Sequence, residues 1–272
     1  MALSDSYDAN PKSRGWEVEL DRLCDQALLS WEQEIRLLTG LGLEDGMSVL
    51  ELGSGPGFVT DKLLSLLPNS HLTAVDINPE MHRRARQHLN SEFLNRLTSV
   101  EASVMDTGLP SESYDFAIAR LIFQHLSQPI QAAQEIIRLL KPGGKLAIID
   151  IDADLWGIAE PYLPELQRIY EKSALAQAKR GGNQFVGRCL WRILQASGYT
   201  RLRLEAFVYH SDELGLEPFI SQMNPDRLLP AVQTGLISPA EFATAHNAYQ
   251  HFLTSPNAYI LMLGLIACGE KA

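Results

Sequence analysis

The chain has 272 residues, 46% of them hydrophobic, and a formal net charge of −10 at pH 7. This length allows one large α/β domain or two small ones, and the hydrophobic fraction suits a globular core, not a disordered chain. Because the charge is negative and no run is rich in Lys and Arg, nucleic acid is not expected as a partner.

Three cysteines, Cys24, Cys189 and Cys268, are far apart in the sequence, and no CxxC motif occurs. This pattern indicates reduced thiols, and we expect a cytoplasmic protein with no metal site. The N-terminus lacks the apolar core of a signal peptide, and the most apolar late stretch, YILMLGLIACGEKA, is too short to span a bilayer. No membrane partner is therefore expected.

Helices and strands are predicted to alternate along the first half of the chain. In order, they are a helix over 16–40, a strand over 48–52, a helix from Gly57, a strand over 71–77, a helix from Pro79, strands over 97–103 and 114–120, a helix from Ser127, and a strand over 145–152 after the turn KPGG. Such alternation with near-continuous apolar strands indicates a parallel sheet covered by helices on both faces.

The alternation stops near Asp152, and helices are predicted over 160–180 and 185–197. We expect the whole chain to form a single domain. Its parts are a helical N-terminal lid over 1–44, a core over 45–151, a helical insert over 152–198, a sixth strand over 199–210, a second helical insert over 211–257, and a last strand over 258–268.

A glycine-rich loop follows the first strand, in the sequence VLELGSGPGFVT. Gly53, Gly55 and Gly57 let the main chain approach a ligand closely at the edge of a parallel sheet. The spacing is GxGxG, whereas a dinucleotide site has GxGxxG and would place its last glycine at Phe58. Glu51 would face a pyrophosphate unfavourably, but it suits a cationic ligand such as an amine or a sulfonium.

The loop resembles the first motif of class I S-adenosylmethionine-dependent methyltransferases. Four further stretches resemble motifs of that family, in order and at its spacing: LTAVDINPEM, SVMDTGLP, YDFAIARLIFQHL and LLKPGGKLAIID. The resemblance covers about residues 45–150 strongly and the last two strands more weakly. It implies a Rossmann-like α/β fold, namely a doubly wound, seven-stranded, mostly parallel sheet with an antiparallel last strand and helical lid and insert elements. It also implies S-adenosyl-L-methionine as the cofactor.

The resemblance places a cofactor site after the first four strands. Asp76 would hold both ribose hydroxyls, and a helix-capping role for it is compatible. Asp106 would accept from the adenine amino group, or else it forms the turn before Gly108. Glu51 would contact the cofactor directly or through water. The complete set is Glu51, Gly53, Ser54, Gly55, Gly57, Asp76, Ile77, Met105, Asp106 and Arg120.

His125 is the candidate catalytic residue, because it follows the fourth strand and histidine titrates near neutral pH. A general base helps only when the acceptor arrives protonated, as a hydroxyl does. The alternative is a histidine that packs in or caps a short helix. The candidate substrate-lining residues are Tyr7, Trp16, Gln124, Trp156 and His210, and the aromatic ones among them equally suit a core.

The expected function is methyl transfer by in-line displacement to a small organic molecule, of the kind found in natural-product pathways. Two sizeable inserts favour an enclosed pocket for such a substrate. The alternatives are a protein or RNA methyltransferase, an NAD-dependent oxidoreductase, and a non-catalytic regulator that binds the cofactor. The predicted state is a monomer or a homodimer, and the sequence does not distinguish O-, N- and C-methylation.

Overall fold

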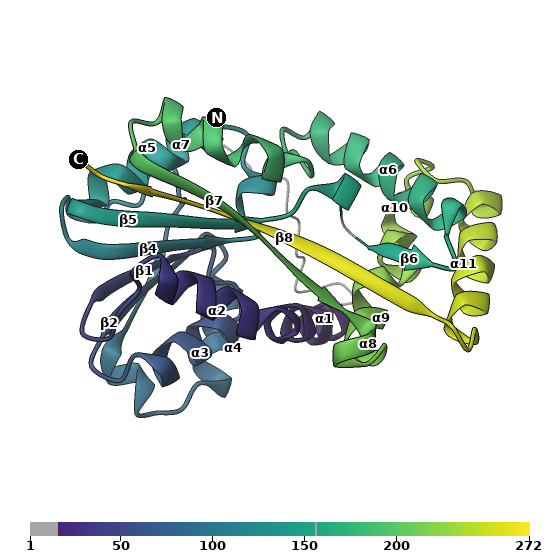
Figure 1. Cartoon of the computed structure of the whole chain (residues 1–272), viewed down its shortest axis with the longest axis horizontal. Coiled ribbons are helices and arrows are strands. Elements are labelled where there is room, and N and C mark those ends of the chain that lie inside the picture. The colour runs from purple at the N-terminus through teal and green to yellow at the C-terminus, as the bar shows by residue number, and fades with distance from the viewer. Residues whose placement is uncertain (1–15, 156) are drawn as a thin grey trace.

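The computed structural model describes residues 16–155 and 157–272, so the predicted substrate contacts at Tyr7 and Trp156 lie outside the described residues. Eight strands form one mixed sheet in the order β3-β2-β1-β4-β5-β8-β6, and β7 also pairs with β8 (Figure 1). The strands are β1 (Ser48–Leu52), β2 (His71–Asp76), β3 (Leu97–Glu101), β4 (Tyr114–Arg120), β5 (Leu140–Asp150), β6 (Ile158–Glu160), β7 (Thr200–His210) and β8 (Tyr259–Glu270).

The parallel part of the sheet is built around β1. This strand pairs with β2 on one side and with β4 on the other, so that Val49 lies opposite Leu72 and Phe116. Strand order therefore reverses at β1, which is where open α/β sheets bind ligands beyond the carboxyl ends of their strands. Strands β1 to β5 are parallel and β8 is antiparallel to β5, which confirms the predicted fold class.

Two features of the sheet differ from the prediction. The sheet has an eighth strand, because the short β6 pairs with the first residues of β8. The KPGG segment, predicted as a turn, lies within β5, where the register against β4 shifts between Tyr114 and Phe116. A Cβ atom at Gly144 would lie 3.0 Å from the carbonyl oxygen of Tyr114, so this close approach of two strands requires glycine.

Helices cover both faces of the sheet, with α5 and α7 on one face and α2, α3 and α4 on the other (Figure 1). The predicted helix over 16–40 is two helices, because the chain bends at Ser30, which has a non-helical φ of −116°. Within the described ranges, no helix has the length and apolar character needed to cross a membrane. The helices are α1 (Trp16–Leu29), α2 (Trp31–Gly40), α3 (Phe58–Leu66), α4 (Pro79–His88), α5 (Pro129–Leu139), α6 (Pro164–Lys179), α7 (Leu190–Ala196), α8 (Ser211–Leu214), α9 (Glu217–Met223), α10 (Leu229–Gln233) and α11 (Pro239–Leu253), with short 3-10 turns η1 (Phe93–Arg96), η2 (Phe123–His125), η3 (Ala153–Leu155), η4 (Val186–Cys189) and η5 (Pro225–Leu228).

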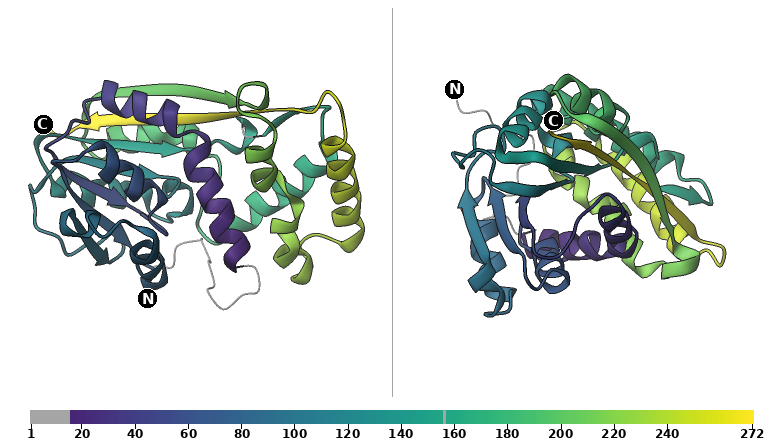
Figure 2. Two further views of the ribbon diagram at one scale, coloured as in Figure 1. Left: turned by 90° about the horizontal axis from the view of Figure 1, so that it is seen from below. Right: turned by 60° about the vertical axis from the view of Figure 1, so that its left-hand side comes forward.

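The helices α6 and α8 to α11, here called the insert helices, lie beyond the end of β5. The long strand β8 joins them to the core, because its second half pairs with β5 and its first half with β6. Helix α1 packs against α3 of the core and against α9 of the insert helices. Figure 2 shows α1 running between these two parts.

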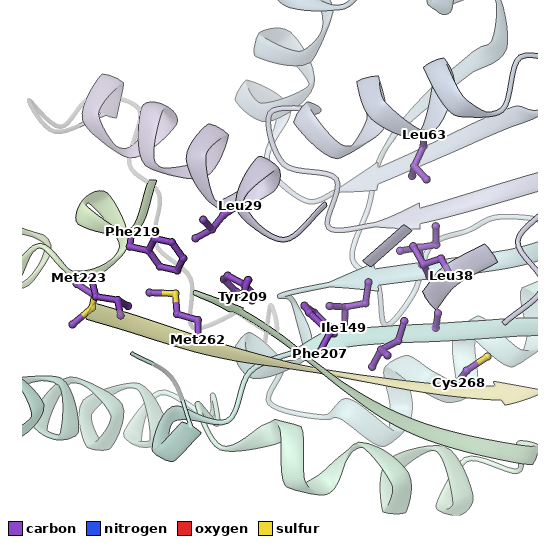
Figure 3. Close-up of a cluster of buried hydrophobic side chains, with 14 of the residues drawn as sticks. Leu29, Leu38, Leu63, Ile149, Phe207, Tyr209, Phe219, Met223, Met262 and Cys268 are labelled. Carbon is purple, nitrogen blue, oxygen red and sulfur yellow. The ribbon is translucent and has the colours of Figure 1, made fainter. Parts of the chain in front are cut away.

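One hydrophobic cluster continues from the core into the insert helices (Figure 3). On the core side it contains Leu38 and Ile149, and on the insert side it contains Phe219 and Met223. Phe207 of β7 connects the two, since side chains at alternate positions of a strand point to one face. A second cluster fills the opposite face of the sheet between the strands and α5 and α7.

Candidate active site

The loop between β1 and α3 has three glycines with positive φ angles, 67° at Gly53, 55° at Gly55 and 85° at Gly57. A Cβ atom at Gly53 would lie 2.6 Å from Cδ1 of Ile122, so this position requires glycine for packing. At Gly55 a Cβ atom would meet no atom within 4 Å. The main chain at Gly55 is therefore open to the cavity, as a ligand-binding loop requires.

Asp76 fastens this loop to the end of β2. Its Oδ2 accepts a hydrogen bond from the Gly55 N–H at 2.8 Å, and its Oδ1 accepts one from the Asn78 N–H at 2.9 Å. The cap of α4 is Asn78, which accepts from the Glu80 N–H. Burial raises the pKa of Asp76. A carboxylate has about four acceptor positions, so Asp76 retains capacity for ligand hydroxyls.

Glu51 lies buried beneath the glycine loop, with 4% of its surface exposed. The Thr60 hydroxyl donates a hydrogen bond to its Oε2 at 2.6 Å. Burial raises the pKa of Glu51 to about 7. The carboxyl group therefore changes its charge near neutral pH, and a cationic ligand would favour its ionised form.

A continuous cavity of about 2290 Å³ runs from the glycine loop to the insert helices. This volume exceeds the roughly 300–1,000 Å³ of an ordinary ligand pocket, so two ligands fit together. Several predicted site residues line it, namely Glu51, Gly53, Ser54, Gly55, Asp76, Ile77, Trp16, Arg120, Gln124 and His125. In the described part of the chain, no group of three or more His, Cys, Asp or Glu residues could hold a metal ion.

The structure places four other predicted site residues outside the lining of this cavity. Gly57 packs against α4, where a Cβ atom would lie 2.7 Å from that of Ala85. Met105 is buried in the second hydrophobic cluster, and Asp106 is exposed. His210 lies at the end of β7, 3.8 Å from Glu213. After β3, the cavity is lined by the apolar side chains of Ala102 and Val104.

Arg120 lines the cavity, but its guanidinium group is bound to the joint between α1 and α2. It lies 2.7 Å and 2.9 Å from the two carboxylate oxygens of Glu34, and it donates to the carbonyl oxygen of Gln26 at 2.8 Å. Glu34 is only 2% exposed, so this is a buried ion pair. Arg120 therefore fixes the N-terminal helices over the carboxyl end of β4.

The chain reverses sharply after Arg120. Leu121 has a φ of 54°, which costs a non-glycine residue about 1–3 kcal/mol and is found mostly at functional sites. Its N–H donates to the carbonyl oxygen of Ile149, and the next residue, Ile122, packs on Gly53. This strained turn brings η2, which contains His125, next to the glycine loop.

The environment of His125 determines which ring nitrogen carries the proton. The amide nitrogen of Gln177 donates to the carbonyl oxygen of Gln124 at 2.9 Å and lies 3.2 Å from Nδ1 of His125. The amide oxygen of Gln177 accepts from Gln184, which fixes the orientation of the amide. Nδ1 is therefore an acceptor, and the neutral ring carries its proton on Nε2.

Burial lowers the pKa of His125 to about 4, and the nearby charges of Arg22 and Arg180 act in the same direction. The ring is thus neutral at physiological pH, with its proton on Nε2. This arrangement does not suit the predicted base role, because a base needs an unprotonated nitrogen that faces the acceptor.

Comparison with known proteins identifies the domain. Residues 50–148 match the family model described as a methyltransferase domain. The chain carries a class I methyltransferase domain. The matched segment begins in β1 and ends in β5, so it contains the glycine loop, Asp76 and His125.

Relatives of this methyltransferase domain include a malonyl-[acyl-carrier protein] O-methyltransferase from Paenibacillus, 34% identical over 36% of this chain and 36% of that protein. A demethylmenaquinone methyltransferase from Chlamydia pneumoniae is 32% identical over 40% of this chain and 46% of that protein. The chain thus spans less than half the length of these relatives. A ubiquinone/menaquinone biosynthesis C-methyltransferase from Proteus mirabilis is 24% identical over 71% of this chain and 72% of that protein.

Among solved structures, phosphoethanolamine N-methyltransferase 2 of Haemonchus contortus, in complex with S-adenosyl-L-methionine, has a TM-score of 0.61. It is 16% identical, and the match covers 100% of this chain and 61% of that one. Geranyl diphosphate C-methyltransferase of Streptomyces coelicolor has a TM-score of 0.54 at 13% identity, covering 97% of this chain and 86% of that one. At these identities the likeness concerns the fold.

Proposed function

We propose that this protein transfers the methyl group of S-adenosyl-L-methionine to a small organic molecule of secondary metabolism. The observation that carries the proposal is the single cavity that joins the glycine loop and Asp76 to the insert helices. A cofactor at the first end and a substrate at the second would meet beside His125, within one cavity.

The residues at the glycine-loop end fit this cofactor. Asp76 would accept from the ribose hydroxyls, and the open main chain at Gly55 leaves room for the ligand. Ile77 and Val104 offer apolar surface to the adenine ring, and the buried Glu51 offers negative charge to a cationic group. When bound, the cofactor supplies a methyl group on a positively charged sulfur.

The chain's own contribution is mainly positioning and the exclusion of water. The buried ion pair of Arg120 with Glu34 holds α1 over the cavity, and His125, contacted by Gln177, lies in the lining of the cavity. A nucleophile that arrives unprotonated needs no base at this site. The relatives include O-, N- and C-methyltransferases, so the acceptor atom of this protein is left open.

The test is a transfer assay with S-adenosylmethionine labelled in its methyl group and a panel of small metabolites, paired with calorimetry of S-adenosylhomocysteine binding. We expect binding and label in an organic product of low mass. Binding without turnover on any acceptor would favour a cofactor-sensing regulator. Label in added protein or RNA would favour the other methyltransferase classes. Absence of binding, with NAD bound instead, would favour an oxidoreductase.

A further inference from the structure

Three buried glutamines line the cavity: Gln124 of η2, Gln177 of α6 and Gln222 of α9. Each of them is 8% exposed or less. A carboxamide has an oxygen that accepts and a nitrogen that donates, and leaving either one unpaired inside a protein costs stability. The hydrogen bonds of these three side chains therefore show which of them is available to a ligand.

Gln177 and Gln222 are bound by the protein at both ends of the amide. The nitrogen of Gln177 donates to the carbonyl oxygen of Gln124 at 2.9 Å, and its oxygen accepts from Gln184 at 2.7 Å. The nitrogen of Gln222 donates to the carbonyl oxygen of Arg22 at 3.0 Å, and its oxygen accepts from the guanidinium group of the same arginine at 3.0 Å. These two amides hold parts of the protein together.

The side chain of Gln124 differs from both. Its nitrogen makes one long hydrogen bond, 3.4 Å to the carbonyl oxygen of Leu121. Because that carbonyl oxygen is an acceptor, the nitrogen faces it and the amide oxygen Oε1 faces the other way. Oε1 accepts no hydrogen bond from the part of the chain that the structure describes, and it is not among the fully enclosed unpaired atoms there. Oε1 is thus an unused acceptor with open surface, on a side chain that lines the cavity.

The main chain of Gln124 is held firmly in place. Its N–H donates to Oδ2 of the buried Asp150 at 3.1 Å, at the end of β5. Its carbonyl oxygen accepts from the Asn183 N–H at 2.7 Å and from Gln177 of α6. Such support from both sides fixes the position of a side chain that recognises a ligand.

These contacts place Gln124 where the two ends of the cavity join. Two residues earlier, Ile122 packs on Gly53 of the glycine loop. On its other side Gln124 is bonded to α6, which is one of the insert helices. The unused amide oxygen therefore lies next to the part of the cavity that the proposed function gives to the substrate.

We infer that Gln124 is a substrate-recognition residue, and that its Oε1 accepts a hydrogen bond from an O–H or N–H group of the substrate. The substrate is thus a hydroxyl or an N–H compound, because a molecule with acceptors alone would leave this buried oxygen unpaired. The inference rests on the proposed function, because it places this molecule beside the bound cofactor.

The test compares matched probes in the protein saturated with S-adenosylhomocysteine. The two members of each pair differ by one hydrogen-bond donor: a phenylalkyl alcohol and its methyl ether, a phenol and its methyl ether, and a secondary amide and its N-methyl derivative. By ligand-observed NMR titration, we expect the donor member of at least one pair to bind about fivefold or more tightly than its partner, the scale of one hydrogen bond.

Variants of Gln124 assign this preference to its amide. Gln124→Met keeps the length of the side chain without the amide and should reduce the preference to about twofold or less, whereas Gln124→Glu keeps an acceptor oxygen and should retain it. Gln128→Met is the matched control, because Gln128 is exposed and does not line the cavity. It should leave the preference unchanged. The affinity for S-adenosylhomocysteine should change by less than about threefold in all three variants.

The absence of a donor preference in every pair would overturn the inference, as would an equal loss in Gln124→Met and Gln128→Met. A loss of S-adenosylhomocysteine affinity of about tenfold in Gln124→Met, with the donor preference intact, would make this residue a cofactor contact instead. Because the probe comparison uses the wild type, the inference can fail even where a variant does not fold. Failure of the wild type to bind S-adenosylhomocysteine would contradict the proposed function, which is measured first and separately.

Discussion

Asp76 is the single side chain that joins the loops after β1 and β2, through the N–H groups of Gly55 and Asn78. If it also holds the ribose hydroxyls, Asp76→Ala should weaken S-adenosylmethionine binding by about 1–3 kcal/mol, the scale of lost hydrogen bonds to a charged group. Calorimetry measures this directly. Asp61→Ala is the matched control, because this α3 carboxylate does not line the cavity. An unchanged affinity in folded Asp76→Ala would contradict the ribose assignment.

The raised pKa of Glu51 predicts that the affinity for the cofactor depends on pH. Its pKa is raised to about 7 by burial, so the side chain is mostly neutral at pH 6 and mostly ionised at pH 7.5. Ionisation should attract the positively charged cofactor by roughly 1 kcal/mol, about fivefold in affinity. Affinity for S-adenosylmethionine should therefore rise over this range in the wild type and stay level in Glu51→Gln. If affinity rose equally with pH in the wild type and in Glu51→Gln, a group other than Glu51 would be responsible for the titration.

His125 is expected to remain neutral across the working pH range, because its pKa is lowered to about 4. A general base would instead give a rate that rises through about pH 6.5, and its loss would cost roughly 10²–10⁴-fold. We expect His125→Gln to change single-turnover methyl transfer by less than about tenfold and to keep the shape of the pH profile. Loss of a rising limb in this variant would restore the base role.

At the scale of elements, the joint between α1 and α2 depends on one buried ion pair. Replacing Glu34 by alanine leaves the Arg120 guanidinium buried without its carboxylate, and breaking such a pair typically costs about 3–5 kcal/mol. Glu34→Ala should therefore lower the free energy of unfolding by about 3 kcal/mol and weaken cofactor binding, because α1 covers the cavity. Chemical denaturation measures the first effect.

Glu32→Ala is the control for this experiment, since Glu32 lies on the same helix and is exposed. It should change stability by less than about 0.5 kcal/mol. Equal effects of the two substitutions would mean that the pair does not hold the helices. The sequence predicts one continuous helix here. Apolar spacing does not reveal that the backbone leaves the helical conformation at Ser30, where the Arg120 guanidinium contacts the serine hydroxyl.

At the scale of the whole molecule, the single-domain organisation is still a prediction. The hydrophobic cluster that contains both Leu38 of the core and Met223 of the insert helices supports it. We expect one cooperative unfolding transition, with coincident circular dichroism and tryptophan fluorescence curves in denaturant. The fluorescence signal comes in part from Trp16 in α1 and Trp191 in α7, which lie in different parts of the chain. Two separate transitions would indicate that the insert helices fold as an independent unit.

The core and the glycine loop were predictable because local signals determine them. Alternating apolar strands and helices predict the parallel sheet, and the GxGxG spacing after β1 predicts the loop with positive φ angles. The part of the cavity that follows β3 was less predictable. Asp106 matches a family motif, but Ala102 and Val104 line the cavity, and apolar residues carry no motif that distinguishes a ligand contact from a core position.

The sequence by itself determined the fold class, the family of the domain and the glycine loop, because each depends on residues close together in the chain. Tertiary structure decided the roles of Arg120 and His125. Their partners Glu34 and Gln177 are 86 and 52 residues away, and no spacing rule connects them. The cavity likewise exists only because α1, α6 and η5 come together after folding, although they lie far apart in the sequence.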